Sequence, residues 1–469
     1  MAKKKELSEA DVSLDPTQVS AGASYEEGIA ASKGFMSNLI KSVSKRFKGT
    51  EILTAEEVRA RTVGIEPYSL AFQWFIECSV LPLQIFMQLA GPLKSYKSSA
   101  LIELASWFMP RPPELPDTAP NIQGSAMIMT TEGKYSSGKV YNMLGKRAPL
   151  LNQLPCQQVE EWMKNAGSLR MAIHKGILVY NAAVSAKASE LPDAPCPIFL
   201  GIDSVAGAQT GEMNEKVDAE GSVGRAHQDR PLLLSTFLAS NASRLTGLPL
   251  IICLTNHEKV EIKTGSMPSF GPPKTRVVGG DAIGFHCALD IRVSPPSREK
   301  KGNREILTLY WELKHSSYGT CRRKLPITYV EEGHGDDKVS YFDWDTTLVK
   351  LLLNLQADDA YDIRSVLEIV EMTEGKYGCE RVGVSCDPKD KQKLTAQELG
   401  RKIQADPVVR AELQKALGLY MYPRWTPEYR WTPGEPEEET KPKKGKAKPE
   451  KKPEEITDGP GEVVVAETE

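Results

Sequence analysis

The sequence lacks the long apolar segments and the cysteine pairs that define several classes of protein. No apolar run in its 469 residues approaches the roughly 18 residues of a membrane-spanning helix. Its eight cysteines are scattered and form no C-x-x-C pair, so neither a disulfide framework nor a zinc site is expected. The opening MAKKKELSEADVS begins with three lysines, as a signal peptide can, but no apolar stretch follows them, which argues against a secretory signal peptide. We therefore expect a cytoplasmic protein, or one made in a bacterial cytoplasm.

A strong net charge is also absent. The chain has 59 Lys and Arg against 62 Asp and Glu, a formal charge of −3, which argues against a uniformly basic surface for nucleic acid. The end of the chain, 433–469, is Pro-, Lys- and Glu-rich, carries a charge of −4 and has almost no apolar residue before Val463. Such a composition buries too little apolar surface to offset the entropy lost on ordering. Residues 434–469 are therefore predicted to form a disordered acidic, Lys-rich tail.

The remaining composition is that of an ordinary globular protein, 40% hydrophobic and 26% charged. The length suits either about three domains or one large α/β core with small appendages. Between Tyr25 and Phe47, apolar residues recur at helical spacing, which predicts an amphipathic helix that packs on its own domain or on a neighbouring subunit. We divide the chain into five parts: a flexible N-terminus 1–23, the helix and linker 24–65, a core 66–330, a small C-terminal domain 331–433 and the tail 434–469.

Short apolar runs alternate with polar helical stretches through the core, which predicts a mostly parallel sheet with helices on both faces. Five runs have the length of buried strands: 84–90, 125–130, 197–202, 250–254 and 288–293. Two segments, 210–229 and 258–280, are long, Gly-rich and aperiodic, as functional or disordered loops are. Beyond the core we predict helices over 343–356 and 395–417, the second beginning with a Thr395-x-x-Glu398 capping box.

A phosphate-binding loop is the first chemical motif of the core. The run GPLKSYKSS, 91–99, follows the first strand and precedes the helical stretch ALIELASWF. Such a loop binds phosphates with backbone N–H groups at a helix N-terminus, a lysine and a Mg²⁺-binding hydroxyl. Gly91, Lys97 and Ser98 stand at the spacing of G-x-x-x-x-G-K-[ST], but Tyr96 replaces the second glycine. The alternative is an ordinary lysine-rich turn between a strand and a helix.

Polar residues follow the next three strands. Asp203 closes the third strand, where an acid at the sheet edge could hold Mg²⁺. Glu132 lies just beyond the second strand, where a carboxylate could deprotonate an attacking water; a solvated loop acid is the alternative. The fourth strand has a polar end, Thr255-Asn256-His257.

Taken in order, these elements resemble the core of RecA-family homologous recombinases. That family has a loop G-P-x-x-S-G-K-[ST], a Glu after the next strand, a D-S-V run, an N-Q pair, and a Gly-Gly loop leading into A-x-x-x-x-L-D-I-R. Here GPLKSYKSS, MIMTTE, GIDSVAG, LTNH and GGDAIGFHCALDIRV occur in that order, and the resemblance covers about 24–417. Tyr96 in the loop and His257 in place of glutamine are more similar to the strand-exchange proteins of large tailed phages than to cellular RecA.

The resemblance implies a RecA-like ATPase core whose N-terminal helix docks on the next subunit to build a helical homo-oligomeric filament. It implies a DNA-dependent ATPase that uses ATP and Mg²⁺ to exchange strands between single-stranded and duplex DNA. A single-strand-binding protein and a loader would be further partners, in the bacterial host cytoplasm if the protein is phage-encoded. Two alternatives stay open: a DNA-binding mediator whose nucleotide site Tyr96 has closed, and a ring-forming helicase with the same core.

The family's nucleotide-site roles carry over to this chain by position. Cofactor binding falls on Gly91, Pro92, Lys94, Ser95, Tyr96, Lys97, Ser98, Ser99 and His257. Metal binding falls on Ser98 and Asp203, and catalysis on Glu132, Lys97 and Lys314. His257 matches the residue that senses the γ-phosphate, with a satisfied polar residue at a strand end as the alternative. Lys314 matches the first of two lysines that reach the neighbour's ATP, and the second falls on Ser316, near Arg322 and Arg323.

The two aperiodic segments match the DNA loops of the family. The residues expected to bind DNA are Arg225 and Arg230 in the first loop, and Lys263, Phe270, Lys274, Arg276, Gly279 and Gly280 in the second. Lysine and arginine would neutralise phosphates, and Phe270 would wedge between bases. Without the resemblance, such charged runs are more typical of a solvated surface.

Overall fold

The computed structural model describes 62–110, 124–131, 137–156, 158–188, 190–192, 195–210, 229–242, 244–245, 247–260, 275–278, 282–320, 322–333, 338–358, 360–380 and 394–426. The chain separates into two units, 1–433 and 434–469, and all described residues belong to the first. The predicted helix between Tyr25 and Phe47 and the predicted acidic tail lie outside the described residues. No helix among the described residues is long and apolar enough to span a membrane.

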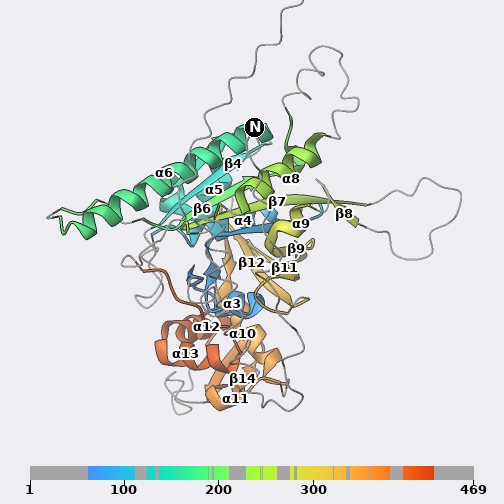
Figure 1. The fold of residues 1–469 in the computed structure, drawn as a ribbon. Coiled ribbons are helices and arrows are strands. Elements are labelled where there is room, and N and C mark those ends of the chain that lie inside the picture. The colour runs from blue at the N-terminus through green and yellow to red at the C-terminus, as the bar shows by residue number, and fades with distance from the viewer. Residues whose placement is uncertain are drawn as a thin grey trace, which may run out of the picture. The chain divides into compact units, whose positions relative to one another are not determined.

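A large, mostly parallel sheet flanked by helices organises the described residues (Figure 1). Its parallel part runs in the order β9 (Cys287–Val293), β3 (Ile85–Gly91), β7 (Leu250–Val260), β6 (Ile198–Asp203), β4 (Ser125–Thr130) and β5 (Leu151–Pro155). Antiparallel strands β11 (Arg304–Ser316), β12 (Lys324–Glu332) and β13 (Val339–Asp343) extend it beyond β9. Two short strands pair at its margins, β10 (Ser297–Lys301) with β11 and β8 (Thr275–Val277) with β7. The predicted fold class, an α/β protein with a mostly parallel sheet, is confirmed at this level.

All five strands predicted from the sequence exist, four of them within one residue of the expected bounds. The fifth, β7, continues to Val260 and pairs with β8, so 258–260 and 275–277 of the segment predicted as a loop, 258–280, are strand. The prediction was wrong there because the end of β7 is polar. The part of a strand that extends past the buried sheet needs only a backbone partner, which β8 supplies. Such a part need not be apolar, so no apolar pattern in the sequence indicates it.

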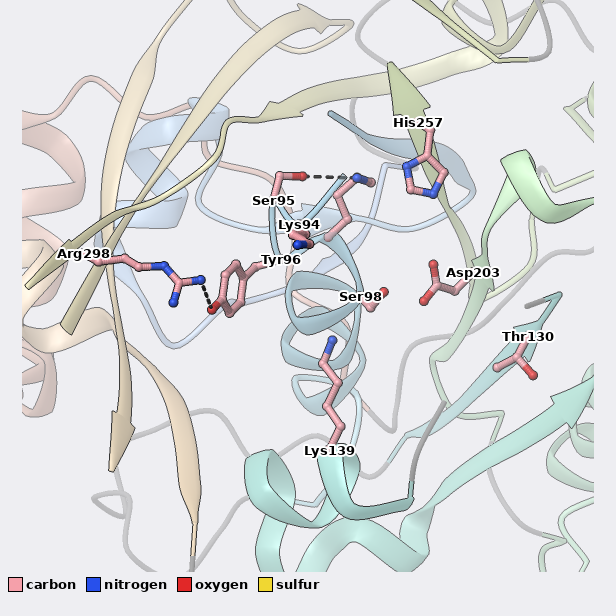
Figure 2. A pocket seen from close by; sticks show the side chains of 10 residues that line it. Lys94, Ser95, Tyr96, Ser98, Thr130, Lys139, Asp203, His257 and Arg298 are labelled. Carbon is pink, nitrogen blue, oxygen red and sulfur yellow. Dashed lines mark hydrogen bonds between the residues drawn. The ribbon is translucent and has the colours of Figure 1, made fainter. Parts of the chain in front are cut away.

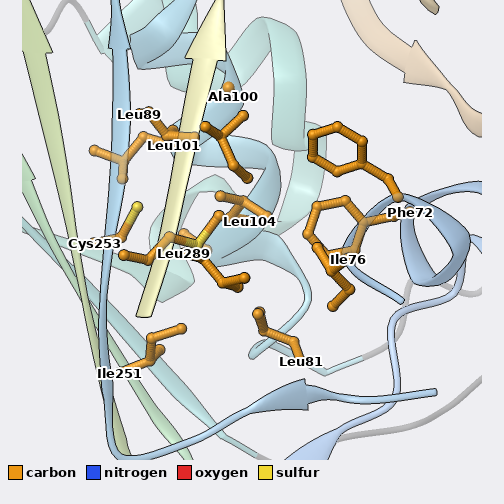
Figure 3. Close-up of a cluster of buried hydrophobic side chains, with 14 of the residues drawn as sticks. Phe72, Ile76, Leu81, Leu89, Ala100, Leu101, Leu104, Ile251, Cys253 and Leu289 are labelled. Carbon is orange, nitrogen blue, oxygen red and sulfur yellow. The ribbon is translucent and has the colours of Figure 1, made fainter. Parts of the chain in front are cut away.

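The central strand β3 is buried along its whole length, because helices cover it. Helix α4 (Lys97–Ser106) presents Ala100, Leu101 and Leu104 to the sheet, and helix α3 (Leu70–Ile76) adds Phe72 and Ile76 to the same apolar cluster (Figure 3). Truncating one such buried leucine to alanine typically costs about 2–5 kcal/mol. The core therefore fixes the start of α4 relative to the end of β3, and with it the loop between them.

The other described helices of this region are α5 (Ser137–Leu144), η3 (Gly145–Leu150), α6 (Val159–Ser185), η4 (Val205–Gly207), α8 (Asp229–Ala242) and α9 (Ala282–His286). Beyond the sheet lie α10 (Trp344–Leu355), α11 (Ile363–Val366), the hairpin β14 (Glu368–Thr373) and β15 (Lys376–Glu380), α12 (Ala396–Ala405) and α13 (Pro407–Ala416). The short strands β1 (Gly64–Ile65) and β2 (Leu81–Pro82) pair near the start of the described chain. Strand β13 lies past residue 330, where we placed the end of the core, so the sheet extends further along the chain than expected.

The two helix predictions beyond the sheet fared differently. The helix over 343–356 is α10, with the Asp343 side chain as its N-cap. The prediction of a single helix over 395–417 was wrong, because the segment forms two helices, α12 and α13, which are separated at Asp406 and Pro407. Proline lacks the N–H that a continuous helix needs and disfavours a helical residue before it. The capping box of Thr395 and Glu398 is confirmed.

Candidate nucleotide site

A cavity of about 410 Å³ opens at the carboxyl ends of the parallel strands (Figure 2). Strand register brings its walls together, because Gly91 of β3 lies opposite His257 of β7, and Thr130 of β4 lies opposite Asp203 of β6. The carboxyl edge of such a sheet is where open α/β proteins bind their ligands. The lining consists of Lys94, Ser95, Tyr96, Lys97, Ser98, Thr130, Lys139, Asp203, His257 and Arg298.

The loop between β3 and α4 is held in a tight curl by its own lysine. The Lys97 ammonium donates to the carbonyl oxygens of Gly91 at 3.0 Å and Pro92 at 2.6 Å, and to the Ser95 hydroxyl at 3.2 Å. Only glycine fits at Gly91, since a Cβ there would lie 2.1 Å from the carbonyl oxygen of Val293. The loop therefore has the curled backbone expected of a phosphate-binding loop, and its lysine lies at the cavity.

Tyr96, which replaces the second glycine of the motif, has a glycine-like backbone. Its φ of 63° and ψ of 23° are left-handed, a conformation that non-glycine residues seldom adopt. The ring packs against Tyr329 with 5.2 Å between centroids, and the hydroxyl accepts a hydrogen bond from Arg298 at 3.4 Å. Figure 2 shows the ring directed toward Arg298 rather than toward Ser98 and Asp203. Burial, with the negative charge of Glu331, raises the pKa of Tyr96 to about 12, so its phenol is neutral at physiological pH.

The carboxylate of Asp203 faces the hydroxyl of Ser98 across the cavity (Figure 2). The Thr255 hydroxyl donates a hydrogen bond to Asp203 Oδ1 and orients it. The next residue is also fixed, because the Thr131 hydroxyl donates to the Ser204 carbonyl at 2.8 Å and accepts from the Ser204 N–H at 2.9 Å. Hard oxygen ligands of this kind, completed by water and substrate phosphates, are what Mg²⁺ prefers. Within the described ranges, no group of three or more His, Cys, Asp or Glu side chains could hold a metal by itself.

A buried chain of polar side chains lies directly behind His257. The Asn256 side chain accepts from the His257 N–H at 2.8 Å and donates to the carbonyl of Val278 at 2.8 Å and to Gln88 at 3.2 Å. Gln88 donates in turn to Asp290 at 2.8 Å, whose pKa is raised by burial. The chain thus connects β9, β3 and β7 to the residue after β8. Sequence reasoning missed it, although Gln88 in an otherwise apolar strand was the available signal.

Two cations of the cavity were also missed. Lys139 comes from α5 and Arg298 from β10, and both line the cavity. Burial lowers the pKa of Lys139, and the negative charges of Asp203 and Glu331 partly offset that shift. Neither residue belongs to a motif, so only the packing of α5 and of the β10–β11 hairpin brings them to the site.

Several residues predicted for the nucleotide site do not line the cavity. Pro92 and Gly91 contribute carbonyl oxygens to the Lys97 contacts, and Ser99 is buried on α4. Lys314 lies on β11 and pairs with Glu312 at 2.9 Å, while Ser316 is buried. Arg323 is bound elsewhere: it pairs with Glu77 at 2.9 Å and stacks on Trp74 at 4.7 Å. Glu132, the predicted base, lies outside the described residues.

Of the residues predicted to bind DNA, the structure describes the side chain of Arg276 alone. Arg276 is exposed on β8, directly opposite the exposed Lys259 of β7. Arg230 belongs to α8, but its side chain is not described. The others lie outside the described residues: Arg225, Lys263, Phe270, Lys274, Gly279 and Gly280.

The sequence matches no protein-family model, and no curated protein is significantly similar to it.

Proposed function

We propose that this protein is an ATP-dependent homologous recombinase with a RecA-like core, which assembles on single-stranded DNA and exchanges strands with duplex DNA. The observation that carries the proposal is the combination at one cavity of a curled loop with Lys97, the Ser98 and Asp203 oxygens, and His257. These groups come from three parallel strands and one helix N-terminus, in the order along the chain that the recombinase motifs require.

The conformation of Tyr96 favours a working nucleotide site over a closed one. Its backbone takes the left-handed form that the motif's glycine would take, and its ring packs on Tyr329. A cavity of about 410 Å³ remains beside it, within the range of small-molecule sites. The nucleotide-inactive alternative requires the ring to fill that space.

Nucleotide binding would change the environment of Lys97. Its ammonium now donates to loop oxygens, and phosphate oxygens would compete for the same donors. Ser98 and Asp203 would hold Mg²⁺, and Glu132 would take the proton from an attacking water. Mg²⁺ bound with the phosphates would neutralise charge that develops on them.

The polar chain behind His257 supports coupling between the nucleotide and DNA. A shift of His257 on phosphate binding would act on Asn256, which holds the residue after β8. The hairpin of β7 and β8 carries Lys259 and Arg276 directly opposite each other. Both exposed side chains would donate to a nucleic-acid phosphate bound along the hairpin.

The deciding experiment measures ATP hydrolysis with and without single-stranded DNA. We expect DNA-stimulated hydrolysis by the intact protein and its loss in Lys97→Ala, with Lys164→Ala on the exposed face of α6 as the control. Glu132→Gln should retain ATP binding and lose hydrolysis, since an amide cannot accept the proton. Hydrolysis that is unchanged in Lys97→Ala would refute the assignment of the loop. Binding of DNA that does not depend on ATP, with no ATP hydrolysis, would favour the mediator alternative.

A further inference from the structure

The described lining of the cavity holds more cations than one phosphate-loop lysine. Among the described lining residues, four are Lys or Arg and one, Asp203, is a carboxylate, while Glu132 lies outside the described residues. Two of the cations lie in the first turns of helices: Lys97 is the first residue of α4, and Lys139 is the third residue of α5. These two helices pack against each other. Figure 2 shows the Lys139 side chain extending from α5 toward the first turn of α4, close to Ser98.

Folding alone does not favour an ammonium at this place. The N-terminal turn of a helix carries a partial positive charge, so a cation there is unfavourable. Lys139 is also half-buried, and burial lowers its pKa despite the charges of Asp203 and Glu331. A lysine whose pKa is perturbed and whose side chain lines a cavity is a candidate for a functional site. A polyanion bound in the cavity would add its negative charge to that of Asp203 and Glu331 and favour the ammonium form of Lys139.

We propose that Lys139 is a second phosphate-binding lysine, which contacts the phosphate chain of the nucleotide from the α5 side of the cavity. The inference rests on the proposed nucleotide site and adds a residue that no motif in the sequence marks. A lysine outside the loop increases the attraction for a polyphosphate without using the backbone of the loop. Lys139 should therefore increase the affinity for ATP more than the affinity for a less charged ligand.

The test compares Lys139→Met with the intact protein by calorimetry, using ATP, ADP and inorganic tripolyphosphate at one Mg²⁺ concentration. Methionine keeps the length of the side chain and removes its charge. The matched control is Lys146→Met, an exposed lysine of η3 that does not line the cavity. We expect Lys139→Met to weaken the binding of ATP and of tripolyphosphate by a similar factor. The factor should be about tenfold or more, which corresponds to the loss of one charge-assisted hydrogen bond. Lys139→Arg and the control should stay within a few-fold of the parent.

Each other outcome has a distinct meaning. If the affinity for ATP fell while that for tripolyphosphate stayed the same, Lys139 would lie at the base or ribose and the proposal would be overturned. Unchanged affinity for both ligands would also overturn it. A parent that binds neither ATP nor ADP would refute the proposed function, and the inference with it. Thermal unfolding without ligand controls for folding: we expect Lys139→Met to unfold at the parent's temperature or above it, with a smaller shift on adding ATP. A lower unfolding temperature together with an unchanged ATP-induced shift would assign Lys139 a structural role and overturn the proposal.

Discussion

Tyr96 packs its ring against Tyr329 of β12 while its own backbone holds a left-handed conformation, at the position where the phosphate-loop motif has glycine. The ring contact stabilises a conformation that costs about 1–2 kcal/mol for a residue with a Cβ. Aromatic pairs contribute roughly 0.5–1.5 kcal/mol beyond the area that they bury, so the two effects are of similar size. Tyr96 thus holds a backbone conformation that glycine adopts readily.

The first prediction compares two substitutions at Tyr96. Both remove the ring, but Tyr96→Gly also relieves the left-handed backbone, so we expect it to be about 1 kcal/mol more stable than Tyr96→Ala. Urea unfolding measures this difference. Neither variant should change ATP affinity much, because the ring lies toward Arg298. A large gain in affinity on removing the ring would instead show that Tyr96 closes the site.

The hydrogen bond from Thr255 to Asp203 gives the second prediction. Thr255→Val keeps the shape of the side chain and removes the donor, at a cost of about 1 kcal/mol in stability. We expect slower ATP hydrolysis and a higher Mg²⁺ concentration for half-maximal activity, because the carboxylate loses its orientation. Thr255→Ser keeps the hydroxyl and should behave like the parent. The same Mg²⁺ requirement in all three proteins would exclude Asp203 as a metal ligand.

The third prediction concerns pH and lies away from the cavity. Burial raises the pKa of Asp345 to about 6, and its side chain accepts hydrogen bonds from Gln404 at 2.6 Å and Tyr68 at 3.2 Å. The folded protein therefore holds this proton more tightly than the unfolded chain, and the resulting stability is lost as pH rises from about 4 through 6. Asp345→Asn removes this titration. The difference in free energy of unfolding between the variant and the parent should shift by about 2 kcal/mol in favour of the variant between pH 4.5 and pH 7.

Denaturant unfolding of the parent and Asp345→Asn at the two pH values measures that gain. The comparison across pH cancels any constant effect of the substitution on packing. An equal stability difference at both pH values would mean that Asp345 titrates normally in the folded protein.

The fourth prediction tests the hairpin of β7 and β8. Lys259→Ala and Arg276→Ala should each reduce the slope of log affinity against log salt for single-stranded DNA by about 0.7, the value per phosphate contact. Each should leave stability nearly unchanged, because both side chains are exposed. Lys164→Ala on α6 serves as the control. A slope that is the same in all four proteins would place the DNA path elsewhere.

The sequence by itself determined much of the parallel sheet and of the loop. The apolar runs of β3, β4, β6, β7 and β9 have the length and composition of buried strands, and the polar residues that end them mark one edge of the sheet. The run from Gly91 to Ser98 predicted a turn between a strand and a helix, and the structure has that turn between β3 and α4; its binding of phosphate stays a prediction. The capping box at Thr395 was equally local. Each of these features depends on neighbours in the chain.

Only the tertiary structure decided the features that depend on contacts between distant segments. The direction of the Tyr96 ring follows from Tyr329, which lies more than 200 residues away. The chain of Gln88, Asn256 and Asp290 exists because three strands are adjacent in the sheet. Lys139 reaches the cavity because α5 packs on α4, and nothing in its neighbourhood in the sequence indicates that position. Packing sets the direction and the electrostatic environment of a side chain. Because packing brings together residues that are distant in the sequence, local sequence patterns do not predict these contacts.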